Sequence, residues 1–245
     1  SIHDWSRFQR QEETMTDSKE KILITGGCSF SELNPYIDTW PSHLAERMPQ
    51  HTHVSKGMCS QGNGLISRSI IHACTTHKDS ELFVGILWSG IDRHDFYLRD
   101  SGISENIDGW EENPTGFTDT KNWVILNGNW QNQFAKAYYG MFHDAIGQVI
   151  YTLEHILRTQ WFSKQHKIPY FMSTYMADVL EPYTDDEDCY LEDCKYLYDQ
   201  IDWNFFLPID GMADWVDKNV GQQGFEKPGD LHPSTLGHKE FTEQV

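Results

Sequence analysis

The chain has 245 residues, of which 38% are hydrophobic and 13% aromatic, and this is enough apolar material for one sizeable core. Its 37 acidic residues outnumber 19 basic ones, and the resulting net charge of −18 disfavours nucleic acid and anionic membranes as partners. No segment approaches the roughly 18 apolar residues of a membrane span, and the N-terminus lacks the apolar core of a signal peptide, so we expect a cytoplasmic or virion-associated protein.

From residue 21 onward the hydrophobic pattern alternates between strand and helix, after a polar N-terminal extension over residues 1–20. Short apolar runs predict three buried strands: 21–25, 82–88 and 168–175. Apolar residues at helical spacing, or a proline in the first turn, predict four helices: 40–48, 62–76, 143–165 and 237–245. Residues 95–135 lack a clear period and predict an irregular or hairpin-bearing insertion. The alternation predicts a single domain over 21–245, a three-layer α/β/α sandwich with a mainly parallel central sheet.

Polar residues that could react with or bind a substrate follow the predicted strands. Ser29 follows the first strand, residues 89–93 follow the second, and residues 230–232 precede the last helix. In a parallel sheet covered by helices, functional groups gather at the carboxyl ends of the strands. We therefore expect these three segments to meet at one edge of the sheet.

The segment Gly26-Gly27-Cys28-Ser29 admits more than one reading. It could be a phosphate-binding loop, but it has neither G-x-G-x-x-G nor the lysine of a Walker motif. It could also be a plain turn. A serine becomes a good nucleophile when an imidazole takes its proton and a carboxylate orients that imidazole, and His232 and Asp230 supply both groups. The nucleophile interpretation is therefore favoured.

Three segments, in order and spacing over residues 21–240, resemble the SGNH (GDSL-type) hydrolases. Residues 27–31 (Gly-Cys-Ser-Phe-Ser) resemble the first block of that family, which carries the nucleophilic serine. Residues 57–63 (Gly-Met-Cys-Ser-Gln-Gly-Asn) resemble the second block, whose glycine N–H enters the oxyanion hole. Residues 230–233 (Asp-Leu-His-Pro), with Gly-His following at 237–238, resemble the last block, which supplies the acid and the base.

The resemblance implies a flavodoxin-like hydrolase fold with Ser29 as nucleophile, His232 as general base and Asp230 as the acid that orients it. It also implies that the N–H of Gly62 stabilises the oxyanion. Neither a cofactor nor a metal belongs to this chemistry, and we expect none.

The chain departs from the family pattern at three places. Cys28 replaces the aspartate before the serine, and Asp230 stands two residues before the histidine, where the family more often has three. Residues 88–93 (Trp-Ser-Gly-Ile-Asp-Arg) replace the third block, Gly-x-Asn-Asp, and lack the asparagine that donates to the oxyanion. Loss of one such donor costs about 10²–10³ in rate elsewhere, so another group must replace it. We expect Asn63 in that role, with Ser89 in reserve.

Other polar features have plainer interpretations. Cys28 could be a rival nucleophile, but strand alternation directs it away from the edge, and His238 is an alternative base that fits better at the start of the last helix. Arg93 either contacts an anionic substrate or pairs with Asp92. Two further groups lack metal-site spacing: the histidines at 51, 53, 72 and 77, and the acidic run 185–188, which is typical of a solvated loop.

The sequence therefore predicts a serine esterase that removes an O-acyl group through a Ser-His-Asp triad. Three tryptophans in and beside the insertion favour a carbohydrate substrate, because flat indole faces suit sugar rings: Trp110, Trp123 and Trp130. Two alternatives stay open. One is a non-catalytic or weakly active binding or structural module of the same fold, such as a glycan-binding component of an assembly, and the other is an O-acyltransferase. The oligomeric state is also open.

Overall fold

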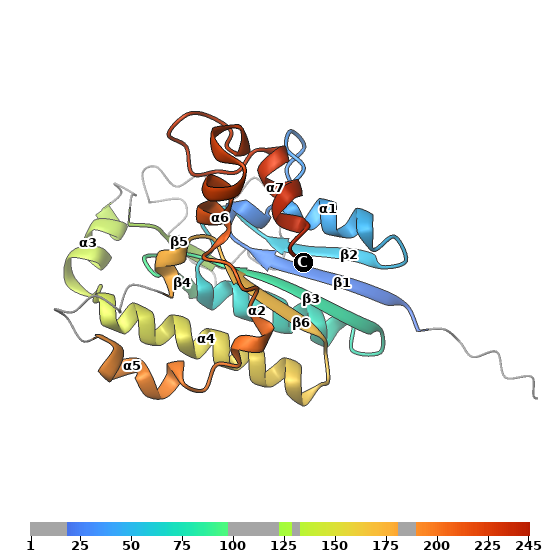
Figure 1. The fold of residues 1–245 in the computed structure, drawn as a ribbon. Helices are drawn as coiled ribbons and strands as arrows, with labels where there is room; N and C mark the ends of the chain where they lie inside the picture. The colour runs from blue at the N-terminus through green and yellow to red at the C-terminus, as the bar shows by residue number, and fades with distance from the viewer. Residues whose placement is uncertain (1–18, 98–122, 129–132, 181–189) are drawn as a thin grey trace, which may run out of the picture.

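The computed structural model describes residues 19–97, 123–128, 133–180 and 190–245 (Figure 1). Its centre is a four-stranded sheet in which every strand pair is parallel, with the order β2-β1-β3-β6. The strands are β1 (Lys21–Gly27), β2 (Thr52–Gly57), β3 (Glu81–Trp88) and β6 (Tyr170–Thr174). The predicted parallel sheet is confirmed. Its strand order changes direction between β1 and β3, and ligands bind at this topological switch point in folds of this kind.

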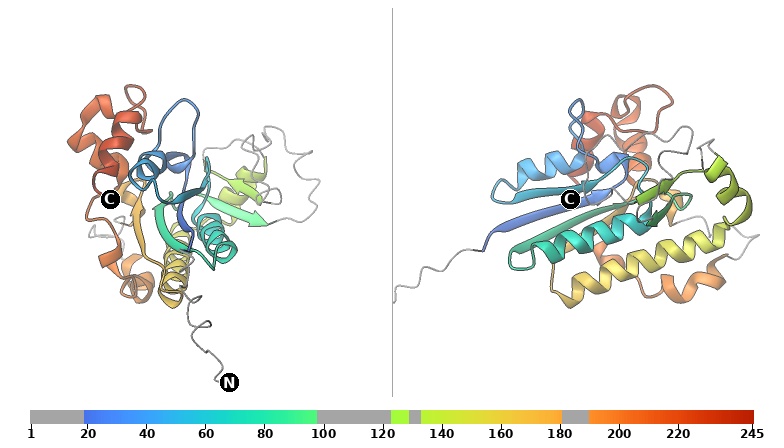
Figure 2. Two further views of the ribbon diagram at one scale, coloured as in Figure 1. Left: turned by 90° about the vertical axis from the view of Figure 1, so that its right-hand side faces the viewer. Right: turned by 180° about the vertical axis from the view of Figure 1, so that it is seen from behind.

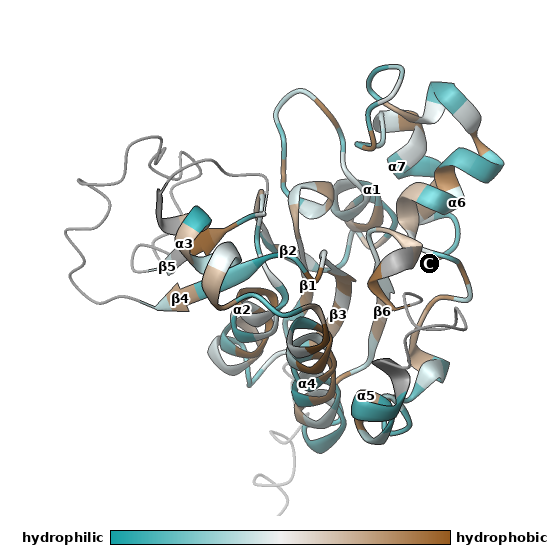
Figure 3. Ribbon diagram, turned by 90° about the vertical axis from the view of Figure 1, so that its left-hand side faces the viewer, coloured by the Kyte–Doolittle hydropathy of each residue, from teal (hydrophilic) through white to brown (hydrophobic). Residues whose placement is uncertain are grey.

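Helices cover both faces of the sheet, as Figure 3 shows in an end-on view. On one face lie α2 (Asn63–Thr76) and α4 (Ala145–Gln165), and α5 (Tyr190–Tyr198) packs against α4. On the other face lie α1 (Trp40–Arg47), α6 (Met212–Asn219) and α7 (Thr235–Thr242) (Figure 2). The predicted three-layer α/β/α architecture is therefore confirmed.

The alternation of side chains along β1 explains why this segment is the central strand. Ile22 and Ile24 belong to the core under α2 and α4, whereas Leu23 belongs to the core under α1, α6 and α7. A strand buried on both faces needs an unbroken apolar run rather than an apolar–polar alternation. That run carries the strand straight to the glycine turn before Ser29.

The insertion after β3 contains the hairpin strands expected there. β4 (His94–Tyr97) pairs antiparallel with β5 (Trp123–Leu126), and α3 (Gln133–Met141) follows. Short 3₁₀ helices lie at Ser29–Ser31, Ala177–Val179, Trp203–Phe205 and Gly221–Gly224. The N-terminal extension up to residue 18, Trp110, Trp130 and the acidic run 185–188 lie outside the described residues.

Several elements were not expected from the sequence. β2 has only one large apolar residue, Val54, and lies at the edge of the sheet, where most of its residues are partly exposed. Such a strand lacks the apolar run that marks a central one.

None of the helices in the described part of the chain is long and apolar enough to cross a membrane.

Candidate active site

The turn after β1 brings the hydroxyl of Ser29 to the carboxyl edge of the sheet. Gly27 ends the strand at φ +154°, and a Cβ at this position would lie 2.7 Å from the carbonyl oxygen of Leu87. Only glycine fits such a close approach. A single 3₁₀ turn follows, closed by the bond from the Ser31 N–H to the Cys28 carbonyl at 2.8 Å. The serine is thereby held by backbone geometry rather than by its own side chain.

A second loop, before α7, presents Asp230 and His232 at the same edge. Its ends are fixed by an isolated antiparallel bridge between Phe225 and Pro233 and by the bond from the Glu226 N–H to the His232 carbonyl at 3.0 Å. Gly229 turns the chain at φ +78°, in the left-handed region that favours glycine. These contacts hold the histidine in place although the loop itself is exposed.

The structure brings Ser29, His232 and Asp230 into one hydrogen-bonded chain. The Oγ of Ser29 lies 3.2 Å from Nε2 of His232, across 203 residues of sequence. Nδ1 of the same ring lies 2.9 Å from Oδ1 of Asp230, which also accepts the His232 backbone N–H at 3.0 Å. Because an ionised Asp230 needs a donor at Nδ1, the neutral ring keeps its lone pair at Nε2, facing the serine.

Solvent reaches this site. The side chain of His232 is 49% exposed and that of Asp230 is 26% exposed, and the imidazole packs against Phe30 with ring centroids 5.2 Å apart. The His232 backbone N–H and then its ring hold the pKa of Asp230 below its ordinary value. The carboxylate therefore stays ionised at neutral pH, as an orienting group requires.

His238 is not available as the base. It is 3% exposed, and its Nδ1 accepts the backbone N–H of Trp40 at 3.2 Å. Burial, with smaller contributions from His43 and His232, lowers its pKa to about 3. His238 is a structural histidine that joins α7 to α1, which removes the alternative left open by the sequence.

The predicted oxyanion groups make hydrogen bonds to other parts of the chain. The N–H of Gly62 donates to Oδ1 of Asp95 at 3.1 Å. The amide of Asn63 donates to the Ser89 carbonyl at 2.9 Å and to Thr152 at 3.1 Å, and its oxygen accepts the Ser89 N–H at 2.8 Å. The Oγ of Ser89 accepts from Arg93 at 2.7 Å. These bonds tie the start of α2 to β4 and to the end of β3.

Asp95 is the polar residue that sequence reasoning missed. It lies in β4, and its two oxygens accept the N–H groups of Gly62 and Leu65, the second at 2.8 Å, so it caps the N-terminus of α2. Burial raises its pKa to about 6, despite the hydrogen bonds and the nearby guanidinium groups of Arg68 and Arg93. One hint that a distant residue caps α2 is visible in the sequence: the helix begins at Asn63, and the residue before it is a glycine, which has no side chain to cap the helix.

Arg93 lies between the end of β3 and the aromatic residues near the site. Its guanidinium stands over the ring of Tyr175, 5.4 Å from the centroid, and Tyr175 packs edge-on against Phe30. Its Nε is buried and has no hydrogen-bond partner among the described residues. Asp92 contributes a favourable charge to Arg93, so the structure leaves both of its expected roles open.

The described part of the chain holds no group of three or more His, Cys, Asp or Glu side chains that could bind a metal ion. Of the four histidines considered above, His53 bonds Thr25 at 2.8 Å, between neighbouring strands of the sheet. This contact gives that histidine a structural role.

No protein-family model and no curated protein matches the chain. Among solved structures, it is similar to one from Desulfitobacterium hafniense described as a lipolytic protein of the G-D-S-L family, with 17% identity, 92% and 97% of the two chains covered, and a TM-score of 0.45. It is also similar to a GDSL-like lipase from Parabacteroides merdae, with 10% identity and a TM-score of 0.43. The match covers 93% of this chain and 94% of the lipase chain. A third similar structure is that of Axe2, an acetylxylan esterase from Geobacillus stearothermophilus, with 14% identity and a TM-score of 0.38. The match covers 93% of this chain and 92% of the Axe2 chain. The function proposed below rests on the geometry of the site.

Proposed function

We propose that this protein is a serine hydrolase acting on esters, with Ser29 as nucleophile, His232 as general base and Asp230 as the orienting acid. The observation that carries the proposal is the continuous path from the Ser29 hydroxyl through both nitrogens of His232 to Asp230. A serine next to an oriented imidazole is the arrangement that acyl transfer requires.

The reaction proceeds in two acyl-transfer steps. Ser29 Oγ attacks the ester carbonyl while its proton passes to Nε2 of His232, and the imidazolium then protonates the leaving alcohol as the C–O bond breaks. Water attacks the resulting acyl-serine, gives a proton to the same nitrogen, and releases the acid and the free serine. The backbone N–H of Ser29 donates to the oxyanion in both steps. A second alcohol in place of water would make the protein an O-acyltransferase.

A carbohydrate as the alcohol part of the ester is a finer proposal, supported by the tryptophans of the insertion. Trp123 is the one of the three among the described residues, and it packs against the guanidinium of Arg68, 5.0 Å from the ring centroid, and edge-on against Tyr97. It therefore offers little free face for a sugar, and the proposal depends on Trp110 and Trp130.

A non-catalytic or weakly active module is the competing proposal. It is favoured by the hydrogen bonds that the Gly62 N–H and the Asn63 amide already make, because an engaged donor is less free to stabilise an oxyanion. It is disfavoured by the intact contact between Ser29 and His232, which a binding surface does not need.

Hydrolysis of a short-chain aryl ester separates the two proposals. We expect Ser29→Ala and His232→Ala each to lower kcat/KM by about 10³-fold or more, because either group alone leaves no activated nucleophile. The matched controls are Ser80→Ala, just before β3 at the opposite edge of the sheet, and His72→Ala, on the exposed side of α2. A fluorophosphonate probe should label the wild type at Ser29. Absence of labelling together with rates equal in all five proteins would establish the module instead.

A further inference from the structure

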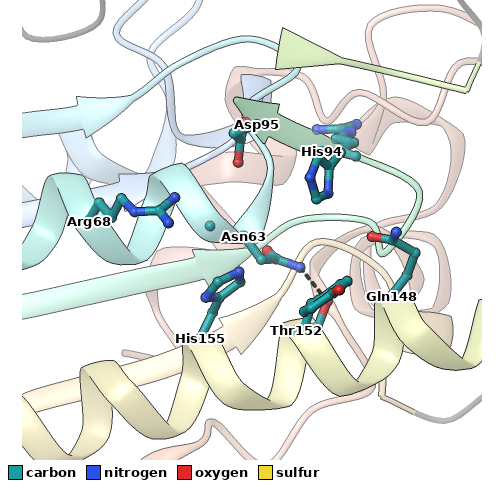
Figure 4. A pocket seen from close by; sticks show the side chains of 10 residues that line it. Asn63, Arg68, His94, Asp95, Gln148, Thr152 and His155 are labelled. Atoms are coloured by element: carbon teal, nitrogen blue, oxygen red, sulfur yellow. Dashed lines mark hydrogen bonds between the residues drawn. The ribbon is translucent and has the colours of Figure 1, made fainter. Parts of the chain in front are cut away.

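A polar cavity separate from the Ser29 site lies between α2, α4 and the start of β4 (Figure 4). Its volume is about 270 Å³. Figure 4 shows Arg68 on α2, His155 on α4, and His94 and Asp95 on β4 arranged around it. The cavity takes no part in the mechanism proposed above.

The space at its centre exists because residue 64 is glycine. A Cβ at Gly64 would lie 3.1 Å from Nε2 of His155 and 3.4 Å from both Nη1 of Arg68 and Oδ2 of Asp95. Three polar groups from three different elements therefore converge on one point. Glycine is a poorer helix former than alanine, so Gly64, in the first turn of α2, costs some helix stability and leaves the space open.

The cavity is cationic although the protein as a whole is strongly acidic. Arg68 and Arg93 line it, against the single carboxylate of Asp95. Both oxygens of that carboxylate already accept backbone N–H groups of α2. Arg158 adds a third guanidinium behind the wall, bonded to Ser67 at 3.0 Å and to the Gly64 carbonyl at 3.3 Å.

One donor of a residue that lines this cavity lacks an acceptor. The buried Nε of Arg93 has no partner among the described residues, and unpaired buried donors are rare in folded proteins. Burial, followed by the charges of Arg158 and Arg68, lowers the pKa of His155 to about 3, so its ring is neutral at pH 7. An anion with several acceptor oxygens would satisfy both the charge and the open donor.

We propose that this cavity binds a compact oxyanion, a carboxylate or a phosphate group, held by Arg68 and Arg93 and hydrogen-bonded by the neutral ring of His155. The first turn of the 14-residue helix α2 adds its partial positive charge. The anion can be free in solution or part of a larger molecule, and in either case the site does not depend on the reactivity of Ser29.

Calorimetric titration of the purified protein with inorganic phosphate, and separately with sodium acetate, tests the proposal at constant ionic strength and pH 7. Saturable binding of either anion is expected, and the tighter of the two identifies the preferred group. Arg68→Gln should weaken it at least about tenfold, since a charge-assisted bond contributes about 1.5 kcal/mol or more. Gly64→Ala should weaken it, because the added methyl lies against the Arg68 and His155 nitrogens that would hold the anion. Lys78→Gln, which removes an equal charge from the surface just beyond α2, should bind like the wild type.

Two further outcomes decide the matter. Ser29→Ala should bind the anion as tightly as the wild type, whereas loss of binding in that variant would place the anion at the esterase site and overturn the proposal. Equal binding by Gly64→Ala, Arg68→Gln and the wild type, or no saturable binding by any of them, would also overturn it. Because no step of this test measures ester hydrolysis, an inactive Ser29 site would leave its result unchanged.

Discussion

Two groups of polar residues lie near the carboxyl edge of the same sheet, and they are built for different purposes. Ser29, His232 and Asp230 lie on exposed turns, and their side chains form one chain of hydrogen bonds that solvent can reach. Asn63 and Ser89 are buried, and the side-chain amide of Asn63 bonds both the backbone N–H and the carbonyl of Ser89.

The difference shows how to distinguish a reactive site from a structural one. A buried polar group must be paired, or it costs stability, so the Asn63 network is satisfied internally and has little capacity left for a substrate. The Ser29 site leaves its hydroxyl and imidazole accessible, as a reaction with an external molecule requires. Substitutions in the first group should therefore change rate without stability, and those in the second group should change stability without rate.

After the Ser29 and His232 variants, the largest effect is expected from Asp230→Asn. An asparagine cannot hold His232 in the tautomer that accepts the serine proton, so kcat/KM for an aryl ester should fall by about 10²–10⁴. The melting temperature should change little, because Asp230 is partly exposed and its side chain bonds groups of its own loop, chiefly His232. Asp217→Asn, on the exposed side of α6, is the matched control. An unchanged rate in Asp230→Asn would remove the orienting role.

Asn63→Ala should have the opposite profile. It leaves the N–H and carbonyl of Ser89 unpaired inside the protein, which should lower the free energy of unfolding in urea by about 2–4 kcal/mol. The rate per folded molecule should stay within about threefold of wild type. Asn34→Ala, in an exposed loop, serves as control. A loss of about 10²–10³ in kcat with wild-type stability would instead restore Asn63 as an oxyanion donor.

The same contrast explains which features could be predicted from the sequence. The central strands were visible because β1 and β3 are nearly unbroken apolar runs, and their ends placed Ser29 at the edge that the 230–232 loop also reaches. β2 was not visible, because an edge strand with a mixed sequence carries no such run. The position of a site thus followed from local patterns and sheet topology.

The oxyanion donors could not be predicted, because a local motif does not reveal competing partners. Gly62 and Asn63 have the residue types and the spacing of the second block, yet Asp95 and Ser89, from distant parts of the chain, occupy their hydrogen-bonding groups. Nothing in a window around residue 62 indicates that an aspartate 33 residues later will cap the helix. Only the tertiary structure resolves such competition.

Acid should destabilise the protein through the buried His238. Its pKa in the fold, about 3, lies below the ordinary value of 6.5, so the unfolded chain binds the proton more tightly and stability falls as the pH drops below 6.5. Between pH 6.5 and pH 5 this costs about 2 kcal/mol. Urea unfolding should show a shallower pH dependence for His238→Asn, whose oxygen can still accept the Trp40 N–H, and an unaltered one for His72→Asn. Parallel curves for wild type and His238→Asn would contradict the assignment.

Asp95 should produce a smaller effect of the opposite sign. Burial raises its pKa in the fold to about 6, above the ordinary 3.8, so the folded protein binds this proton more tightly and gains stability as the pH falls through 6. Asp95→Asn lacks that gain and also loses one of the two acceptors that cap α2. The buried histidines titrate in both proteins and cancel in the difference between them. The stability of wild type relative to Asp95→Asn, from urea unfolding at pH 6.5 and pH 5, should therefore increase by about 1 kcal/mol at the lower pH. A constant difference would mean that the Asp95 carboxyl has ordinary acidity and that α2 is capped by a well-solvated charge.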